Sequence, residues 1–286
     1  PLGLRLLDMT KGHPTRLLLR FAMPIFLGNL LQQCYNLVDT ALAGHMLGDA
    51  ALSEIGATAA LYSLITSFAF GFNSGMALLV SRFWGSGERE RMRRAVCWMV
   101  VLGTGVAALL TGGLLGVRRP LLSLLQTPPE VLPGALQYIT VILAGIPLTM
   151  AYNLESGLLR AVGNSMTPLL LLLCSTVLNV GLDLYLVLTL RMGVAGVAWA
   201  TLIAQGVSAV AAFLLFAREL RAYDAPSAVC FDVRELKNMA RVALPSVFQQ
   251  STVSIGMMLV QSVVNSFGAE TLAGYSAAMR IESICT

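Results

Sequence analysis

Charged residues are scarce in this chain of 286 residues: Asp, Glu, Lys and Arg together make up 12% of it, whereas 56% of it is apolar. A soluble domain usually carries about 25% charged residues. The deficit excludes an ordinary water-soluble fold, a disordered chain and a nucleic-acid-binding protein that depends on basic patches. The composition therefore indicates an integral membrane protein.

Cysteine and histidine are also sparse. The five cysteines are scattered without a C-x-x-C spacing, and the two histidines are His13 and His45. Two histidines cannot build a zinc site, and scattered cysteines do not form a disulfide framework. Both observations weigh against a disulfide scaffold and a metalloenzyme. The sequence as a whole leads us to predict no catalytic residues and no bound cofactor.

Long apolar runs are what the chain has in abundance. A helix needs about 20 mainly apolar residues to cross a bilayer. The runs are uniformly apolar and lack the alternation of barrel strands, so they predict helices. They are Phe21–Val38, Ile55–Ser81, Ala95–Val117, Val131–Leu154, Met166–Leu182, Met192–Ala217 and Val242–Ala269, with an eighth beginning near Thr271.

Several of these runs contain pairs of glycines or a proline. Small residues four apart allow two helices to approach closely in lipid. The pairs are Gly71 with Gly75 and Gly112 with Gly116. A proline within or near the start of a span is expected to bend the helix. The prolines so placed are Pro24, Pro147 and Pro245.

Lys and Arg are distributed unequally between the connecting segments. With the amino terminus inside, the inner segments hold fifteen of them, and the outer segments hold three: Arg118, Arg119 and Arg191. Cytoplasmic segments carry an excess of Lys and Arg. The sequence therefore predicts a multi-pass protein with a cytoplasmic amino terminus.

A weak internal repeat relates the first span to the seventh. Phe21-Ala-Met-Pro24 resembles Val242-Ala-Leu-Pro245. Six spans separate the copies, so both face the same way, as in transporters built from two parallel six-helix bundles. We predict an all-α polytopic fold with a six-span amino-terminal lobe. Its expected divisions are the lobe over residues 1–217, a cytoplasmic linker over 218–237, and the start of a second, truncated lobe over 238–286.

Several short motifs carry a family resemblance. They are Asn36-Leu-Val-Asp39-Thr40, Ala50-Ala-Leu-Ser-Glu-Ile-Gly56, Arg160-Ala-Val-Gly-Asn164, Leu178-Asn179-Val-Gly-Leu-Asp183 and the glycine- and alanine-rich stretch 193–201. With them the chain resembles the multidrug and toxic compound extrusion (MATE) family, on its DinF-like branch. The resemblance implies a cation-coupled antiporter in the cytoplasmic membrane of a prokaryote. It would export organic, often cationic, drugs, driven by an inward proton or sodium gradient, without an obligate protein partner.

Asp39 and Asp183 are the notable acidic residues within the predicted spans. An ionisable group inside a span costs about 2.5–3.5 kcal/mol on insertion scales and usually has a function. Both acids come late in outward-running spans, so we expect them at one depth, in the outer half of the bilayer. Two carboxylates in one cavity are relieved by a proton or a cation. The alternative is that each is a helix-end acid at the outer interface; the resemblance favours a cation site, because the family uses acids at the matching positions.

Neutral oxygens are expected around these acids. Asn179 precedes Asp183 by four residues, Tyr35 precedes Asp39 by four, and Thr201 lies in the outer half of the sixth span. Asp39, Asp183, Asn179 and Thr201 offer oxygens that suit sodium or a hydrogen-bonded proton. Tyr35 and Thr201 could equally be polar contacts between helices. The resemblance adds Asn153, which we place nearer the inner side.

Two other functions stay open at this stage. A lipid-linked oligosaccharide flippase would favour a cavity lined by several cationic residues, whereas Arg280 is the one cation inside the predicted spans. An intramembrane aspartyl enzyme would need a Gly-x-Gly-Asp motif, but Val-Gly-Leu precedes Asp183 and Asn-Leu-Val precedes Asp39.

Overall fold

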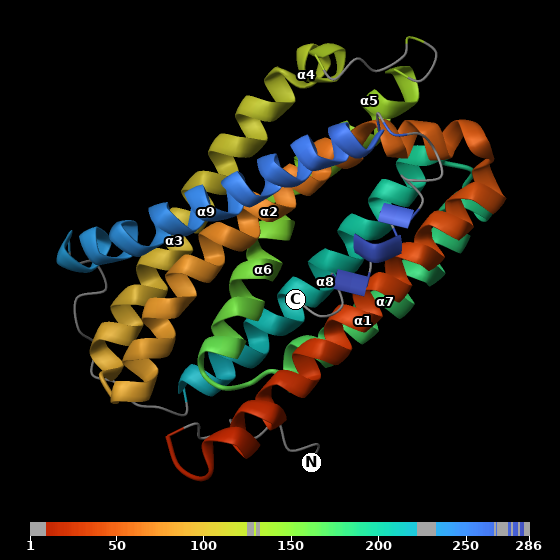
Figure 1. Ribbon diagram of the computed structural model, residues 1–286. Coiled ribbons are helices and arrows are strands. Elements are labelled where there is room, and N and C mark those ends of the chain that lie inside the picture. The colour runs from red at the N-terminus through yellow and green to blue at the C-terminus, as the bar shows by residue number, and fades with distance from the viewer. Residues whose placement is uncertain are drawn as a thin grey trace.

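A computed structural model describes residues 10–124, 129, 132–221, 233–265, 267, 274–275, 277–279 and 281–282. In these ranges the regular elements are all helices, as predicted, and they form an elongated bundle (Figure 1). They are α1 (Pro14–Leu47), α2 (Asp49–Ser86), α3 (Arg89–Gly116), α4 (Arg118–Leu124), α5 (Leu132–Ala144), α6 (Ile146–Ala161), α7 (Met166–Leu184), the π-helical turn η1 (Tyr185–Thr189), α8 (Val194–Arg221) and α9 (Val233–Asn265).

The helices follow the predicted spans. Five of the described helices are long and apolar enough to cross a membrane, and the bent pair α5 and α6 makes a sixth. Helix α9 covers the predicted seventh run as far as Asn265 but is not among these candidate spans. Most of the eighth run lies outside the described residues, Arg280 included. Helix α8 continues to Arg221 and α9 begins at Val233, so both helices extend into the segment 218–237 that the sequence predicts as a linker.

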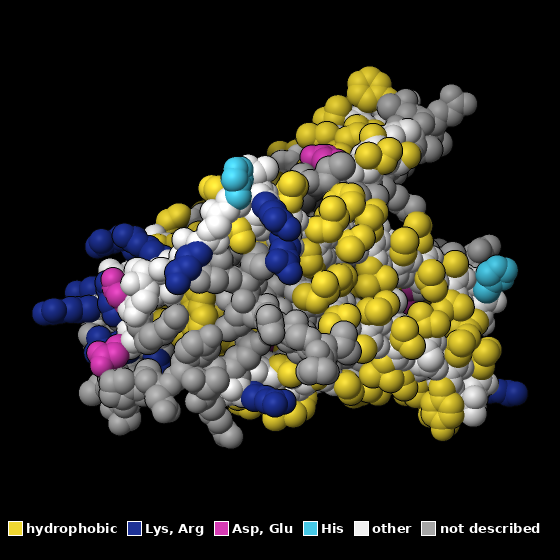
Figure 2. All heavy atoms as spheres, turned by 90° about the horizontal axis from the view of Figure 1, so that it is seen from below, with side chains coloured by type: hydrophobic (Ala, Val, Ile, Leu, Met, Phe, Trp, Pro, Cys, Tyr) yellow, Lys and Arg dark blue, Asp and Glu magenta, His cyan; other side chains and the backbone are white. Residues whose placement is uncertain are grey.

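The surface carries many hydrophobic side chains. Leu109, Val177 and Phe248 are 76%, 67% and 69% exposed. Figure 2, seen from below, shows hydrophobic side chains over the right and upper part of this face, with most of its Lys and Arg at the left and centre. So much exposed apolar surface is unusual for a soluble monomer. It fits a multi-pass protein whose helices face lipid.

The core lies among α2, α3, α5 and α6. Its fully buried side chains include Met76, Met99, Ile139 and Leu158, one from each of these helices. Helix α2 also crosses α9 at close range. A Cβ at Gly75 would lie 2.8 Å from the Ser246 Oγ atom, which confirms the expectation of close approach at the first glycine pair.

The second glycine pair behaves differently. A Cβ at Gly112 or Gly116 would meet nothing within 4 Å among the described residues. The expectation of close packing at this pair is wrong in this structure, because the small-residue spacing allows a contact but does not supply the partner helix.

The fourth predicted run is not one straight span. Helices α5 and α6 meet at an angle of 47°, and Pro147 stands in the first turn of α6. Gly145 lies at the break, where a Cβ would overlap the Leu202 side chain on α8. The bend predicted at Pro147 is therefore present. Pro24 lies inside α1 and Pro245 inside α9, and the bends predicted at these two prolines stay predictions.

A hydrogen-bonded turn fixes the start of α7. Gly163 has φ of 89°, a conformation that favours glycine. The Asn164 side chain then accepts a hydrogen bond from the Thr167 backbone N–H at 3.0 Å and donates one to the Thr167 hydroxyl at 2.7 Å. These bonds satisfy polar groups at the helix end. They anchor the helix that carries Asn179 and Asp183.

Candidate cation site

Three helices bring five of the predicted residues together. Tyr35 and Asp39 lie one turn apart on α1, and Asn179 and Asp183 lie one turn apart on α7. Residues four apart share a helix face. Helices α1 and α7 pack against each other (Figure 1), and α8, which also packs against α7, contributes Thr201.

The Asn179 amide links the three helices. Its Nδ2 atom donates to the Tyr35 hydroxyl at 2.5 Å and to the Thr201 Oγ1 atom at 3.3 Å. The Thr201 hydroxyl itself donates to the Val197 carbonyl at 3.2 Å. An amide NH₂ has two donors, and both are used here. The Asn179 Oδ1 atom is buried and has no hydrogen-bond partner within the described ranges.

The two carboxyl groups lie against each other. Asp39 and Asp183 are close enough for a proton between them to form a hydrogen bond. Asp183 is 1% exposed and Asp39 is half-buried. The Asp39 Oδ1 atom and both Asp183 oxygens are buried without a hydrogen-bond donor in the part of the chain that the structure describes. Burying unpaired carboxylates is costly, so this arrangement favours a bound proton or cation.

All the potential ligands in the site are oxygens. Carboxylate, amide and hydroxyl oxygens suit a hard cation and not a soft transition metal. Among the described residues, no three His, Cys, Asp or Glu side chains gather in one place. The donor set therefore fits sodium or a proton.

Two tyrosines near the acids were not anticipated. Tyr62 of α2 and Tyr138 of α5 both lie near enough to Asp39 to interact with it electrostatically. Both belong to uniformly apolar runs, where an aromatic residue is ordinary and periodicity does not show which face turns inward. The sequence carries no signal that separates them from core residues.

Asn153 lies elsewhere. Its Nδ2 atom donates to the Thr149 carbonyl on its own helix at 2.8 Å. It lines a separate cavity of about 350 Å³ with Asn73 and Arg160. The sequence prediction counts Asn153 among the cation-site residues, but the structure does not bring it together with Asp39 and Asp183.

A turn of π-helix begins at Tyr185, two residues after Asp183. In η1 the Leu190 N–H donates to the Tyr185 carbonyl at 3.3 Å, one residue further back than in an α-helix. Such turns are rare and often occur at functional sites. No sequence pattern predicts this one.

The fold and the site together define a polytopic membrane protein with a buried acidic pair inside a helical lobe. The MatE family model matches residues 24–185, more than half of the chain. The chain therefore belongs to the MatE family.

Similar proteins agree with this assignment. The chain is 31% identical to the probable multidrug resistance protein YpnP of Bacillus subtilis, over 98% of this chain and 62% of the relative. A solved structure, described as the outward-facing conformation of a multidrug resistance MATE family transporter of the MOP superfamily, is 27% identical with a TM-score of 0.83, over 99% of this chain and 62% of that one. A MOP superfamily transporter from Pyrococcus furiosus is 26% identical with a TM-score of 0.84, over 97% and 62%. The chain thus spans somewhat less than two thirds of the length of these proteins.

Proposed function

We propose that this chain forms the cation-coupling lobe of a multidrug efflux transporter. The transporter would export organic, often cationic, compounds while protons or sodium ions move inward. It would lie in the cytoplasmic membrane of a prokaryote with its amino terminus inside. The observation that carries the proposal is the pairing of Asp39 with Asp183, whose buried oxygens lack donors among the described residues. The names of the relatives support the substrate class.

The site can couple the ion to a conformational change through charge alone. Without an ion, the two carboxylates repel each other in a poorly solvated place; with a proton or sodium ion, the repulsion is relieved. A ligand that stabilises one conformation over another by a few kcal/mol shifts a two-state equilibrium substantially. Sodium would use oxygens of Asp39, Asp183, Asn179 and Thr201, whereas a proton would be shared between the carboxyl groups.

Efflux by the native protein tests this proposal. Asp39→Asn and Asp183→Asn should each reduce gradient-driven drug efflux from membrane vesicles to background, with the variant still folded in the membrane. Because the two acids act as one unit, the double variant should be no worse than either single one. Glu90→Gln, at an exposed position in the first turn of α3, is the control and should retain efflux. Near-normal coupled efflux by either Asp variant would show that its acid is structural.

A second candidate is the movement of a lipid-linked oligosaccharide. One observation favours it: Arg160 is a half-buried cation that lines the cavity containing Asn73 and Asn153. The Arg160 Nε atom donates to the Ser156 carbonyl at 3.2 Å, and guanidinium groups recognise phosphate well. If Arg160→Gln abolishes transport of a lipid-linked pyrophosphate substrate that the native protein moves, this candidate replaces drug efflux. If the native protein moves no such substrate, the candidate fails.

A further inference from the structure

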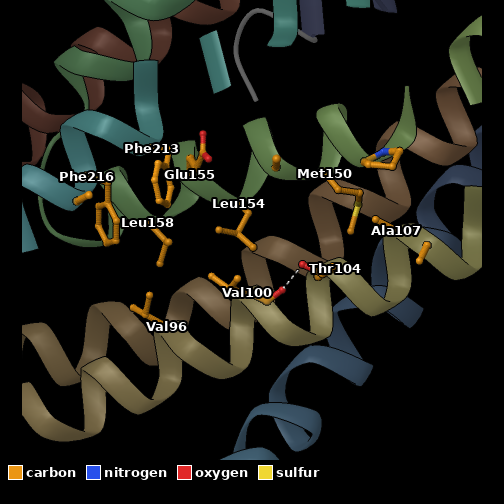
Figure 3. Close-up of a pocket in the computed structure, with 15 residues that line it drawn as sticks. Val96, Val100, Thr104, Ala107, Met150, Leu154, Glu155, Leu158, Phe213 and Phe216 are labelled. Atoms are coloured by element: carbon orange, nitrogen blue, oxygen red, sulfur yellow. Dashed lines mark hydrogen bonds between the residues drawn. The ribbon is translucent and has the colours of Figure 1, made fainter. Parts of the chain in front are cut away.

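A cavity outside the candidate cation site lies between α3, α6 and α8. Its volume is about 360 Å³, which is within the range of small-molecule sites. Its walls include Val96 and Val100 of α3, Leu154 and Leu158 of α6, and Phe216 of α8. Figure 3 shows the two valines facing the side chains of α6 and α8 across the cavity. Such apolar walls suit the uncharged part of a small molecule.

Among the described residues that line this cavity, Glu155 is the one with a charged side chain. It is 9% exposed, and its Oε2 atom is buried without a hydrogen-bond partner in the described part of the chain. The Thr104 hydroxyl, also in the lining, already donates to the Val100 carbonyl at 2.8 Å. A carboxylate in apolar surroundings is costly unless a positive group pairs with it.

Aromatic rings stand beside this carboxyl group. Phe213 and Phe216 of α8 line the same cavity, and Figure 3 shows Phe213 and Glu155 on one side of it. The face of an aromatic ring attracts a cation, most strongly where water is excluded. A carboxylate, two phenyl rings and aliphatic walls together select a positive charge on an apolar body.

The cavity is distinct from the cation site. Helix α6 carries Glu155 but contributes none of the residues grouped around Asp39 and Asp183. Glu155 and Arg160 also line different cavities, so α6 presents a negative group to one space and a positive group to another.

We propose that this cavity binds one lipophilic organic cation, with its positive group at Glu155 and its apolar body between α3, α6 and α8. The inference deepens the proposed efflux function by assigning a cation-binding site within the lobe. Binding here requires neither Asp39 nor Asp183. The competing occupant is a lipid acyl chain, which would use the apolar walls without the carboxylate.

Binding of tetraphenylphosphonium to the purified protein, measured by equilibrium dialysis in detergent with protein-free micelles as the blank, tests the proposal. Glu155→Gln should weaken binding at least tenfold. Ala108→Phe, which places a ring in the cavity lining, should weaken it as well. Leu109→Phe is the matched control. Leu109 is the next residue on the same helix, its side chain is 76% exposed, and it does not line the cavity. Tetraphenylborate, of similar shape and opposite charge, should not compete.

Two results would overturn the inference. Unchanged affinity in Glu155→Gln, or equal competition by tetraphenylborate, would show an apolar groove for acyl chains. Asp39→Asn separates this inference from the proposed function: it should lose coupled efflux and keep tetraphenylphosphonium binding. Loss of binding in Asp39→Asn with retention in Glu155→Gln would place the organic cation at the acidic pair, leaving the proposed function intact.

Discussion

At the scale of single residues, Asn179 determines how the candidate cation site is assembled. Its two donors are used by Tyr35 and Thr201, which belong to two other helices. Its remaining oxygen is buried without a partner among the described residues, as are oxygens of Asp39 and Asp183. The amide therefore contributes both an oxygen acceptor and the links that hold α1, α7 and α8 in register.

Replacing Asn179 tests this double role. Asn179→Ala should lower the affinity for the coupling cation about tenfold, equivalent to about 1.4 kcal/mol, since an acceptor and two hydrogen bonds are lost. Isothermal titration with sodium, or pH titration of drug binding if the ion is a proton, measures the affinity. Asn153→Ala is the matched control, because Asn153 lines a separate cavity. Equal losses in both variants would indicate a general structural effect and contradict the assignment.

The sequence predicts the two acidic residues of the candidate cation site more completely than the residues that surround them. Asp39 and Asp183 could be paired because charge is rare within spans and the direction of each span sets its depth. Asn179 and Tyr35 followed from the spacing of one helical turn. Tyr62 and Tyr138 could not be found, because a uniformly apolar helix gives no periodic signal for the face that turns inward.

At the scale of the elements, the break between α5 and α6 depends on close contact with α8. The Cβ that Gly145 lacks would overlap the Leu202 side chain. Pro147 follows in the first turn of α6, where its missing N–H does little harm. The proline predicts a bend, but the tight contact with Leu202 depends on tertiary packing that no local pattern contains. Because close approach depends on tertiary packing, the sequence also wrongly predicts a close helix contact at Gly112 and Gly116.

Gly145→Ala should therefore destabilise the protein. Overpacking a tight contact costs about 1–3 kcal/mol, and a lower Tm in a thermal unfolding assay would report it. Adding Leu202→Ala should restore part of the loss, because the clashing side chain is removed. Gly105→Ala, on a helix face with nothing within 4 Å, should not lower the Tm. An unchanged Tm in Gly145→Ala would mean that α5 and α6 are not held by this contact.

At the scale of the whole molecule, the distribution of charge agrees with one orientation in the membrane. The predicted inner segments hold fifteen Lys and Arg residues against three in the outer ones. At the junction of α2 and α3, Glu88 forms an exposed ion pair with Arg91 of α3 at 3.0 Å. Arg118 begins α4 at the other end of α3. The parallel second lobe remains a prediction from the repeat, since most of the predicted eighth run lies outside the described residues.

Labelling from outside the cell tests the orientation. In a variant without native cysteines, Arg118→Cys should react with a membrane-impermeant maleimide on intact cells. Arg93→Cys should react only after the membrane is opened, because we place the start of α3 in the cytoplasm. Both positions are exposed, so burial does not distinguish them. The reverse pattern would invert the topology and the common depth assigned to the acids.

The most direct test of the central claim counts the cations released when the drug binds. The claim is that Asp39 and Asp183 form one coupled site. Drug binding to the purified native protein should release one proton or one sodium ion per molecule, as followed with a pH indicator and a sodium-sensitive electrode. Asp39→Asn, Asp183→Asn and the double variant should each abolish this release to the same extent. A single variant that still releases the cation, or losses that add up in the double variant, would show that the two acids do not form one site.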